Sequence, residues 1–387
     1  YTSGSGNDSD TFHSGRHNIT SGEGDDSFTI KDYAGFSPGD IVGGLGGRNN
    51  WFTIQAGNND TGDKGVKTLN LGSADLQQWT SGAGDDVITS SSESQIYRLY
   101  TYDGDDNITL DGFIENLYAG GGNDTITLRR GAGASWNNAY VYGDAGDDSI
   151  TISGDYLVRA QIKGGTGNDR IDISGVGEGF LKTDDPSETI TGDDGDDTLI
   201  GNNDKNKLYG GSGNDYISGG NGNNSLYGGS ENDIIISGSG EDYIEGGSGD
   251  DQITGGGGND VIYGGTASQK GEDKYVDTYK LSGIKNDYRI SRATNPTFDY
   301  VYYIQDLRDG SPDGLDTLYD IDKLQFSDNE QVSLEELFVD HLPITDDGDA
   351  SFSITGTATV GNTLSVSYTH LRAHETVLDL VCRLLLE

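Results

Sequence analysis

The sequence predicts an all-β protein coiled as a parallel solenoid, with a β-rich cap at its C-terminal end. Three observations support this prediction. Eight nonapeptides follow one another in unbroken register from Gly192 to Tyr263. Each of them has Leu or Ile at position eight, so one side chain per repeat is expected to face inward. Glycine accounts for 62 of the 387 residues and hydrophobic residues for only 32%, so no large conventional core is expected.

Residues 1–191 are expected to form irregular coils of the same kind. A turn rich in glycine and aspartate recurs there at looser spacing, for example as SGEGDDSFT from Ser21 and SGAGDDVIT from Ser81. Apolar residues that alternate as inward pairs, such as Ile108 and Leu110, predict strands longer than those of the nonapeptides. We therefore expect a wider parallel β-helix that narrows into a tight roll.

Residues 192–265 are expected to form that tight roll. In each copy a six-residue turn precedes a three-residue strand, and the glycines of the turn are free to adopt positive φ. With two copies per coil, copies i and i+2 become neighbours on the same edge. One edge then stacks the position-six residues Asp197, Asp215, Asp233 and Asp251, and the other stacks Asn206, Asn224, Asp242 and Asp260.

The turns have the composition of calcium sites. Calcium takes about six to eight oxygen ligands, and one turn cannot supply so many. We therefore expect several Ca²⁺ ions between stacked turns, held by the position-six side chains and by turn glycines, namely Gly211, Gly213, Gly229, Gly247, Gly249, Gly256 and Gly258. An amide offers one oxygen and no charge, so binding at the Asn206 and Asn224 end is expected to be weak or absent.

Further candidate ligands occupy the same position in residues 1–191: Asp26, Asp86, Asp106, Asp124, Asp148 and Asp169. The segments between them keep the phase without the acids, so only one edge of those coils is expected to bind metal. Adjacent acids such as Asp85 and Asp105 are expected to add negative field and not to bind the ion. Position nine predicts an outward threonine ladder, formed by Thr29, Thr89, Thr109, Thr127 and Thr151.

The copies resemble the G-G-x-G-x-D-x-U-x repeat of RTX proteins, the haemolysin-type calcium-binding repeats that fold as a parallel β-roll. The tandem resemblance covers the 72 residues from Gly192 to Tyr263. Asp204 and Glu231 depart from it at position four, where the pattern has glycine, and two copies carry Asn for Asp. These departures put individual ions in doubt, not the fold. The resemblance implies type I secretion and folding in extracellular calcium.

Charge narrows the possible partners. The net charge of −41 argues against a nucleic acid or an anionic membrane as partner. Fourteen acidic residues face only two lysines in the repeat block, so stacked turns should repel one another unless cations bind, and folding coupled to calcium follows. No apolar run is long enough to span a bilayer. Cys382 is the only cysteine, so no disulfide framework is expected.

The remainder of the chain differs from the repeats. Residues 266–340, rich in alternating Tyr segments, are expected to be a β-rich capping domain, because the last coil of a solenoid must be covered. Residues 341–366 predict a linker and the start of an Ig-like repeat. Residues 367–387 resemble translated adapter read-through and are expected to be a non-native tail, with a native amphipathic helix as the alternative.

No zinc-protease, serine-triad or phosphate-loop pattern is present, so no enzymatic activity is expected. The sequence favours a calcium-binding structural region of a large secreted or surface-attached bacterial protein, adhesin-like, whose cell-surface or carbohydrate target is unknown. The alternative is the C-terminal secretion and folding module of an exported hydrolase whose catalytic domain is missing. A more distant alternative is an ice- or carbohydrate-binding β-helix that uses the threonine face.

Overall fold

The structure is a computed structural model that divides the chain into two compact units, Tyr1–Leu334 and Glu335–Glu387. It describes residues 75–80, 83–92, 94–130, 138–154, 159–177, 189–266 and 275–338, and, outside them, strands within 9–12, 17–21, 26–30, 52–56, 67–71, 352–355 and 365–368. The second unit contains an antiparallel pair of strands, β31 (Phe352–Thr355) and β32 (Ser365–Tyr368).

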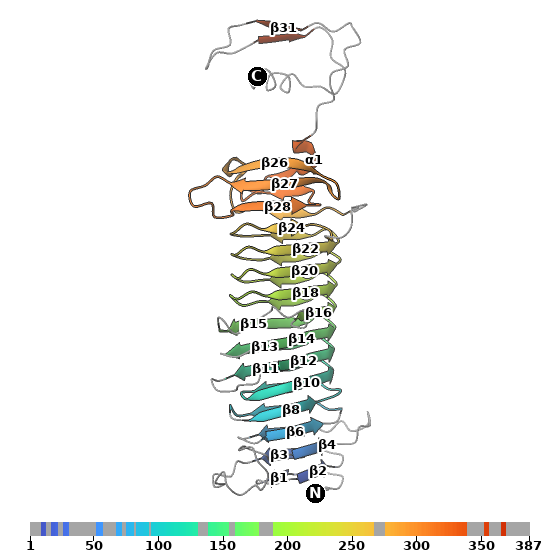
Figure 1. Cartoon of the computed structure of the whole chain (residues 1–387). Helices are drawn as coiled ribbons and strands as arrows, with labels where there is room; N and C mark the ends of the chain where they lie inside the picture. Colours follow the sequence, from blue (N-terminus) through green and yellow to red (C-terminus); the bar gives the residue numbers. More distant parts are fainter. Residues whose placement is uncertain are drawn as a thin grey trace. The chain divides into compact units, whose positions relative to one another are not determined.

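The first unit is a stack of coils, and each coil gives one strand to each of two parallel sheets (Figure 1). The first of these, the odd sheet, contains β1 (Ser9–Phe12), β3 (Asp26–Ile30), β5 (Lys67–Leu71), β7 (Val87–Ser90), β9 (Asn107–Leu110), β11 (Thr125–Arg130), β13 (Ser149–Gly154), β15 (Arg170–Val176), β17 (Thr198–Ile200), β19 (Tyr216–Ser218), β21 (Ile234–Ile236), β23 (Gln252–Thr254), β25 (Thr278–Lys280), β29 (Lys323–Gln325) and β30 (Gln331–Ser333).

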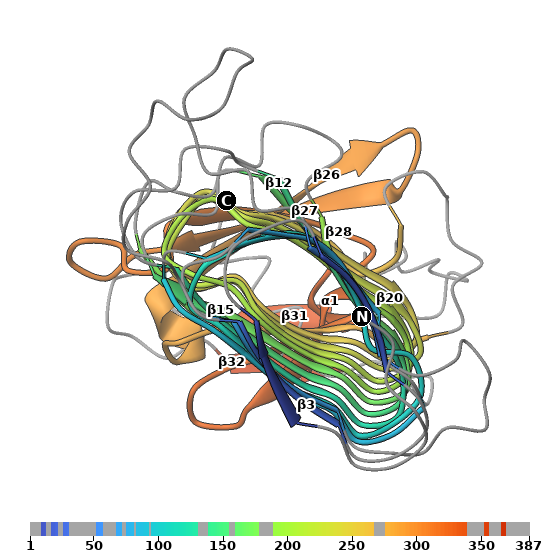
Figure 2. The same cartoon turned by 90° about the horizontal axis from the view of Figure 1, so that it is seen from below.

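The even sheet lies opposite, and the coils of the two sheets superimpose when seen along the stack (Figure 2). It contains β2 (His17–Ser21), β4 (Phe52–Ala56), β6 (Asp75–Thr80), β8 (Gln95–Tyr100), β10 (Phe113–Gly121), β12 (Asn138–Ala145), β14 (Arg159–Thr166), β16 (Ile190–Asp194), β18 (Lys207–Ser212), β20 (Ser225–Ser230), β22 (Tyr243–Ser248), β24 (Val261–Tyr263), β28 (Leu315–Tyr319), β27 (Asp299–Asp306) and β26 (Tyr288–Asn295).

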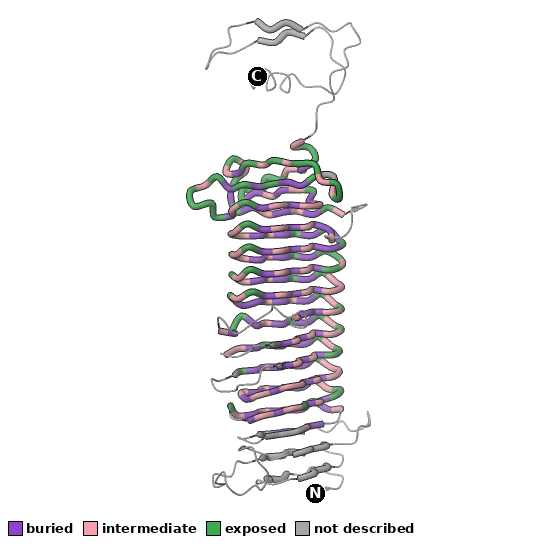
Figure 3. The backbone as a smooth tube through the Cα atoms, viewed as in Figure 1, coloured by how far each residue is buried: buried purple, intermediate pink, exposed green. Residues whose placement is uncertain are grey.

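Position eight of the nonapeptides forms the core between the sheets. Leu199 pairs with Ile217 and Ile217 with Ile235 in the odd sheet, so neighbouring coils are two copies apart, as predicted. All eight position-eight side chains are buried, and buried positions repeat from coil to coil along the stack (Figure 3). Parallel pairing in this register stacks like on like, which buries a continuous aliphatic column.

The upstream coils have the longer strands that the sequence predicts. In the odd sheet β13 has six residues and β15 has seven, whereas β17 and β19 have three each. In the even sheet β10 has nine and β12 has eight, whereas β18 and β20 have six each. The predicted inward pairs are buried: Ile108 and Leu110, Ile126 and Leu128, Ile150 and Ile152, and Ile171 and Ile173. The prediction of an all-β parallel solenoid is thus confirmed.

The threonine ladder spans four successive coils. Thr89, Thr109, Thr127 and Thr151 pair in register along the odd sheet, and the next partner in the column is Asp172. Thr29 pairs with Asn70, and its side chain lies outside the described residues. The ladder is therefore bounded at its C-terminal end by an acid.

Antiparallel strands end the parallel stack. β28 pairs in parallel with β24 and so extends the even sheet. β27 then pairs antiparallel with β28, and β26 pairs antiparallel with β27. In the odd sheet β30 pairs antiparallel with β29. A single 3₁₀ turn, η1 (Lys285–Asp287), precedes β26, and a short helix, α1 (Leu334–Leu337), follows β30. We call residues 278–334 the cap.

Candidate metal centres

Turns that lead from the even sheet to the odd sheet carry a continuous column of buried aspartates, which we call the aspartate edge. Its members are Asp86, Asp106, Asp124, Asp148, Asp169, Asp197, Asp215, Asp233 and Asp251. The backbone N–H of each donates to Oδ1 of the next, as from Asp197 to Asp215 and from Asp215 to Asp233, both at 2.8 Å. The upstream and the regular candidate ligands therefore form one row, and the bond from Asp169 to Asp197 (2.7 Å) joins them.

The second carboxylate oxygen is buried without a donor in most members of this edge. Within the described part of the chain, Oδ2 has no hydrogen-bond partner in Asp124, Asp148, Asp169, Asp197, Asp215 and Asp233. An anionic oxygen in that position is costly, because burial removes its water and supplies nothing in return. A cation is the partner that fits an oxygen row of this kind.

Position-one glycines form one wall of each cradle. A Cβ built on Gly210 would overlap Oδ2 of Asp215 and the carbonyl oxygen of Gly228 in the next coil. A Cβ built on Gly228 would in the same way overlap Oδ2 of Asp233 and the carbonyl oxygen of Gly246. Oxygens from two coils thus converge where a side chain is excluded. Hard oxygen donors suit Ca²⁺, which the position-six carboxylates would hold together with these and further turn carbonyls.

Glycines at positions two and four shape the turns. The predicted set has φ between +86° and +136°: Gly211, Gly213, Gly229, Gly247, Gly249, Gly256 and Gly258. Glu231, a departure from the pattern, adopts φ +73° at position four, and its Oε2 accepts the N–H of Gly213 at 2.9 Å. This departure therefore leaves the turn intact, although a non-glycine residue with positive φ is strained.

Burial raises the pKa values of the position-six carboxyls. Desolvation raises the pKa to about 8 for Asp124, Asp197 and Asp233, and to about 7 for Asp148 and Asp215. The backbone N–H bonded to Oδ1 lowers each pKa but does not offset desolvation. Without a cation, these carboxyls therefore hold a proton near neutral pH more readily than a free aspartate.

Metal-free protein is expected to become more stable as the pH falls from about 8 to about 5. A folded-state pKa of about 7 to 8 lies above that of an unfolded aspartate, so the folded state binds more protons across this window and gains stability as they bind. Thermal unfolding of metal-stripped protein, followed by circular dichroism at several pH values, checks this. A melting temperature that falls on acidification would contradict it.

Turns that lead from the odd sheet to the even sheet form the asparagine edge, which contains Asn206, Asn224, Asp242 and Asp260. The same backbone ladder joins them: Asn206 N–H donates to Asn224 Oδ1 at 3.0 Å, and Asn224 N–H donates to Asp242 Oδ1 at 2.6 Å. Alternate nonapeptides therefore place their position-six residues on alternate edges, as predicted. The amide groups here donate to carbonyl oxygens, whereas Asp260 keeps an Oδ2 without a donor.

Position five carries a second ladder that runs in the opposite direction. Asp105 N–H donates to Asp85 Oδ1 at 3.0 Å, and Asn214 N–H donates to Asp196 Oδ1 at 2.7 Å. These side chains are exposed. The acids expected only to add negative field thus also join neighbouring coils, which the sequence analysis did not foresee.

The aspartate edge and the asparagine edge both continue beyond the nonapeptides, through acids that the nonapeptide pattern does not predict. Asp251 N–H donates to Asp277 Oδ1 at 2.9 Å, and Asp277 N–H donates to Asp322 Oδ2 at 2.9 Å. On the asparagine edge, Asp260 N–H donates to Asp316 Oδ1 at 3.1 Å. The available signal was an Asp two residues before a buried apolar side chain, as in Asp277-Thr-Tyr279 and Asp316-Thr-Leu.

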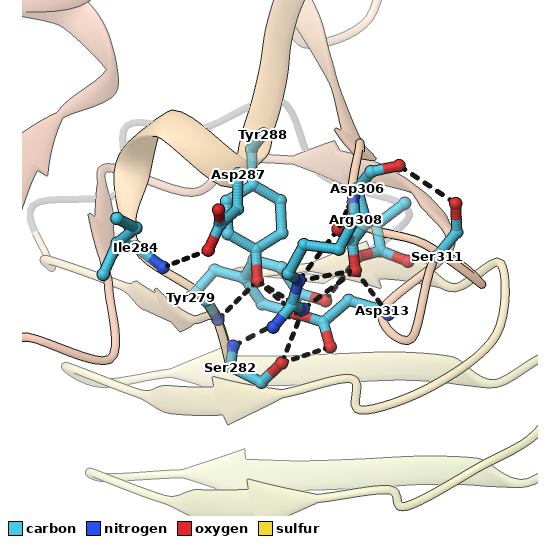
Figure 4. Close-up of polar contacts among 11 residues, drawn as sticks. Tyr279, Ser282, Ile284, Asp287, Tyr288, Asp306, Arg308, Ser311 and Asp313 are labelled. Atoms are coloured by element: carbon cyan, nitrogen blue, oxygen red, sulfur yellow. Dashed lines mark hydrogen bonds and ion pairs between the residues drawn. The ribbon is translucent and has the colours of Figure 1, made fainter.

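The cap contains a polar cluster that supplies its own cation (Figure 4). Arg308 Nη2 lies 2.8 Å from Asp306 Oδ2 and 3.1 Å from Asp313 Oδ2. Tyr288 and Ser282 also donate to Asp313. Burial would raise the pKa of Asp306, but hydrogen bonds from Arg308 and from the N–H of Asp313 outweigh it and lower the pKa to about 2. These acids are thus neutralised by protein groups.

Two negative findings apply to the described residues only. Among them no three His, Cys, Asp or Glu side chains form a metal-binding group, so a site on either edge would need backbone carbonyls as ligands. No helix in the described part of the chain is long and apolar enough to cross a membrane. Asp26 begins β3, and its side chain lies outside the described residues.

Comparison with known families agrees with this geometry. Residues 187–217, 209–244 and 236–267 match the family described as RTX calcium-binding nonapeptide repeat (4 copies). The chain thus carries RTX repeats across the regular part of the solenoid, and the resemblance drawn from the nonapeptides is confirmed there. A search of curated proteins finds no match to this chain.

Proposed function

We propose that this chain is a calcium-binding, non-catalytic structural region of a secreted or surface-attached bacterial RTX protein, which folds when calcium binds after export. The observation that carries the proposal is the row of buried Oδ2 atoms without donors from Asp124 to Asp233 along the aspartate edge. The match of residues 187–267 to calcium-binding repeats supports the choice of ion. Convergence of carboxylate and carbonyl oxygens around the position-one glycines supports it as well.

Calcium would act between coils. The carboxylate at position six accepts a backbone N–H through Oδ1, which fixes its orientation and leaves Oδ2 for the ion. An ion held by oxygens of two coils would join them and offset the repulsion of a chain with net charge −41. Binding of the ion and stacking of the two coils would therefore stabilise each other.

The difference in calcium concentration between the cytosol and the cell exterior would couple folding of this chain to its export. Extracellular calcium modules bind with dissociation constants of about 10⁻⁴ to 10⁻³ M, so such sites fill outside the cell and stay unloaded in the cytosol. An adhesin-like role is supported by the strand pair β31–β32, which falls where an Ig-like repeat was expected to start. The natural gene tests this role: if it encodes residues before Tyr1, further repeats there favour the role, and a catalytic domain favours the hydrolase alternative.

Counting bound ions tests the proposal directly. Equilibrium dialysis of the full chain against calcium, with elemental analysis, is expected to give several ions per chain. Asp197→Ala should lower the count by about one, because its carboxylate is a proposed ligand. Asp196→Ala, the adjacent exposed position-five residue, should leave the count unchanged. No bound calcium, or equal losses in both variants, would overturn the proposal.

A further inference from the structure

The side-chain amide of Asn206 lies in a cage of oxygens. Its Nδ2 is 2.9 Å from the carbonyl oxygen of Asn202, 2.8 Å from that of Asp204, 2.8 Å from that of Gly219, and 3.1 Å from Asn224 Oδ1. An amide nitrogen has two protons, so four acceptors exceed its capacity. The surroundings also fix its orientation, since an amide oxygen in that place would face only oxygens.

Asn224 repeats the arrangement in the next coil. Its Nδ2 donates to the carbonyl oxygen of Gly222 at 2.7 Å and lies 3.3 Å from that of Ser237. In both cases one oxygen comes from position four of the same turn and another from position one of the next coil. The cage is therefore a property of the turn and not of one residue.

The aspartate edge presents an equivalent oxygen to its carboxylates. Around Gly210, the carbonyl oxygen of Gly228 lies beside Asp215 Oδ2, and around Gly201 the carbonyl oxygen of Gly219 lies beside the Asn206 amide. Position one of the next coil thus supplies an oxygen on both edges. On one edge it faces an oxygen without a donor, and on the other it faces a nitrogen that donates to it.

The turn backbone follows the identity of residue six. Position four has positive φ in the turns of Asp215, Asp242 and Asp260, at Gly213 (+123°), Gly240 (+139°) and Gly258 (+136°). In the turns of the two asparagines, position four is Asp204 or Gly222, and neither has positive φ. Because Asp and Asn turns differ even within the asparagine edge, the change accompanies the amide and not the edge.

We propose that the carboxamide nitrogens of Asn206 and Asn224 take the place of bound cations, so that these two turns are closed without metal. The inference rests on the proposed calcium function of the aspartate edge and deepens it. A neutral donor inside an oxygen cage supplies two protons to its oxygens without any ion, and it adds no charge to repel the neighbouring turn. Asn206 and Asn224 therefore determine which edge of their coils requires calcium.

The double variant Asn206→Asp/Asn224→Asp tests the proposal on the full chain. Each new carboxylate replaces a donor by an oxygen, so each should add a calcium site. Dialysis is expected to show about one further ion per new carboxylate, and folding should depend more steeply on calcium concentration, because that slope counts the ions taken up on folding. An unchanged ion count together with an unchanged slope would overturn the proposal.

The reciprocal variant Asp215→Asn/Asp233→Asn tests the proposal even if the Asn206→Asp/Asn224→Asp variant does not fold. If amides substitute for cations, this variant should bind fewer ions and fold at a lower calcium concentration than the parent chain. If it needs more calcium than the parent, asparagine has merely removed ligands and the proposal is wrong. Should the parent bind no calcium, the proposed function fails by itself. The reciprocal variant then still tests the amides, because it must melt at a higher temperature in metal-free buffer.

Discussion

Metal-stripped protein at pH 8 is expected to lose most of its β-structure and to regain it cooperatively when calcium is added. At this pH a carboxyl with a pKa of about 7, such as that of Asp215, is largely ionised, and one with a pKa of about 8, such as that of Asp233, is about half ionised. An ionised Asp215 or Asp233 holds a buried anionic Oδ2 without a donor, beside the carboxyl of the neighbouring coil. Far-UV circular dichroism during a calcium titration measures the change.

Two controls separate site binding from general screening of charge. Magnesium demands a smaller octahedral shell and dehydrates reluctantly, so it should restore much less structure at equal concentration. Sodium chloride at matched ionic strength screens the net charge of −41 but should not refold the chain. Full β-structure in metal-free buffer at pH 8 would show that the aliphatic core suffices and would leave calcium without a structural role.

The fold could be predicted because its signal is periodic. An aliphatic residue every nine positions requires one inward side chain per turn, and two copies per coil place Leu199, Ile217 and Ile235 in one column, as the structure shows. Longer upstream strands were predictable from inward pairs such as Ile150 and Ile152. Patterns of this kind depend only on local spacing, so no knowledge of distant contacts is needed.

The remaining parts depend on contacts across insertions. Asp277 joins the aspartate column 26 residues after Asp251, and Asp316 joins the other column 56 residues after Asp260. The nonapeptide period gives 18 residues per coil, so it cannot identify either partner. The role of Asn206 was also not predictable, because the amide was judged as a poor ligand, whereas the structure shows its nitrogen acting as a donor.

Gly228→Ala is expected to remove one cation site and to destabilise the protein by about 1 to 3 kcal/mol, the usual cost of overpacking a tight position. The new Cβ would overlap Asp233 Oδ2 and the carbonyl oxygen of Gly246, the two oxygens that the cradle brings together. Gly228 does not adopt positive φ, so the effect comes from the blocked cradle and not from the backbone. Dialysis and urea unfolding in saturating calcium measure both losses.

Gly310→Ala is the matched control, because at Gly310 the same substitution strains the backbone without filling any space that an ion could use. Gly310 has φ +82° and no atom near a new Cβ, so alanine strains the backbone by about 1 kcal/mol or more but blocks nothing. Its ion count should equal that of the parent chain. If Gly228→Ala also keeps the full ion count while losing stability, the oxygens beside Gly228 do not hold a cation, and the row of sites must be assigned elsewhere.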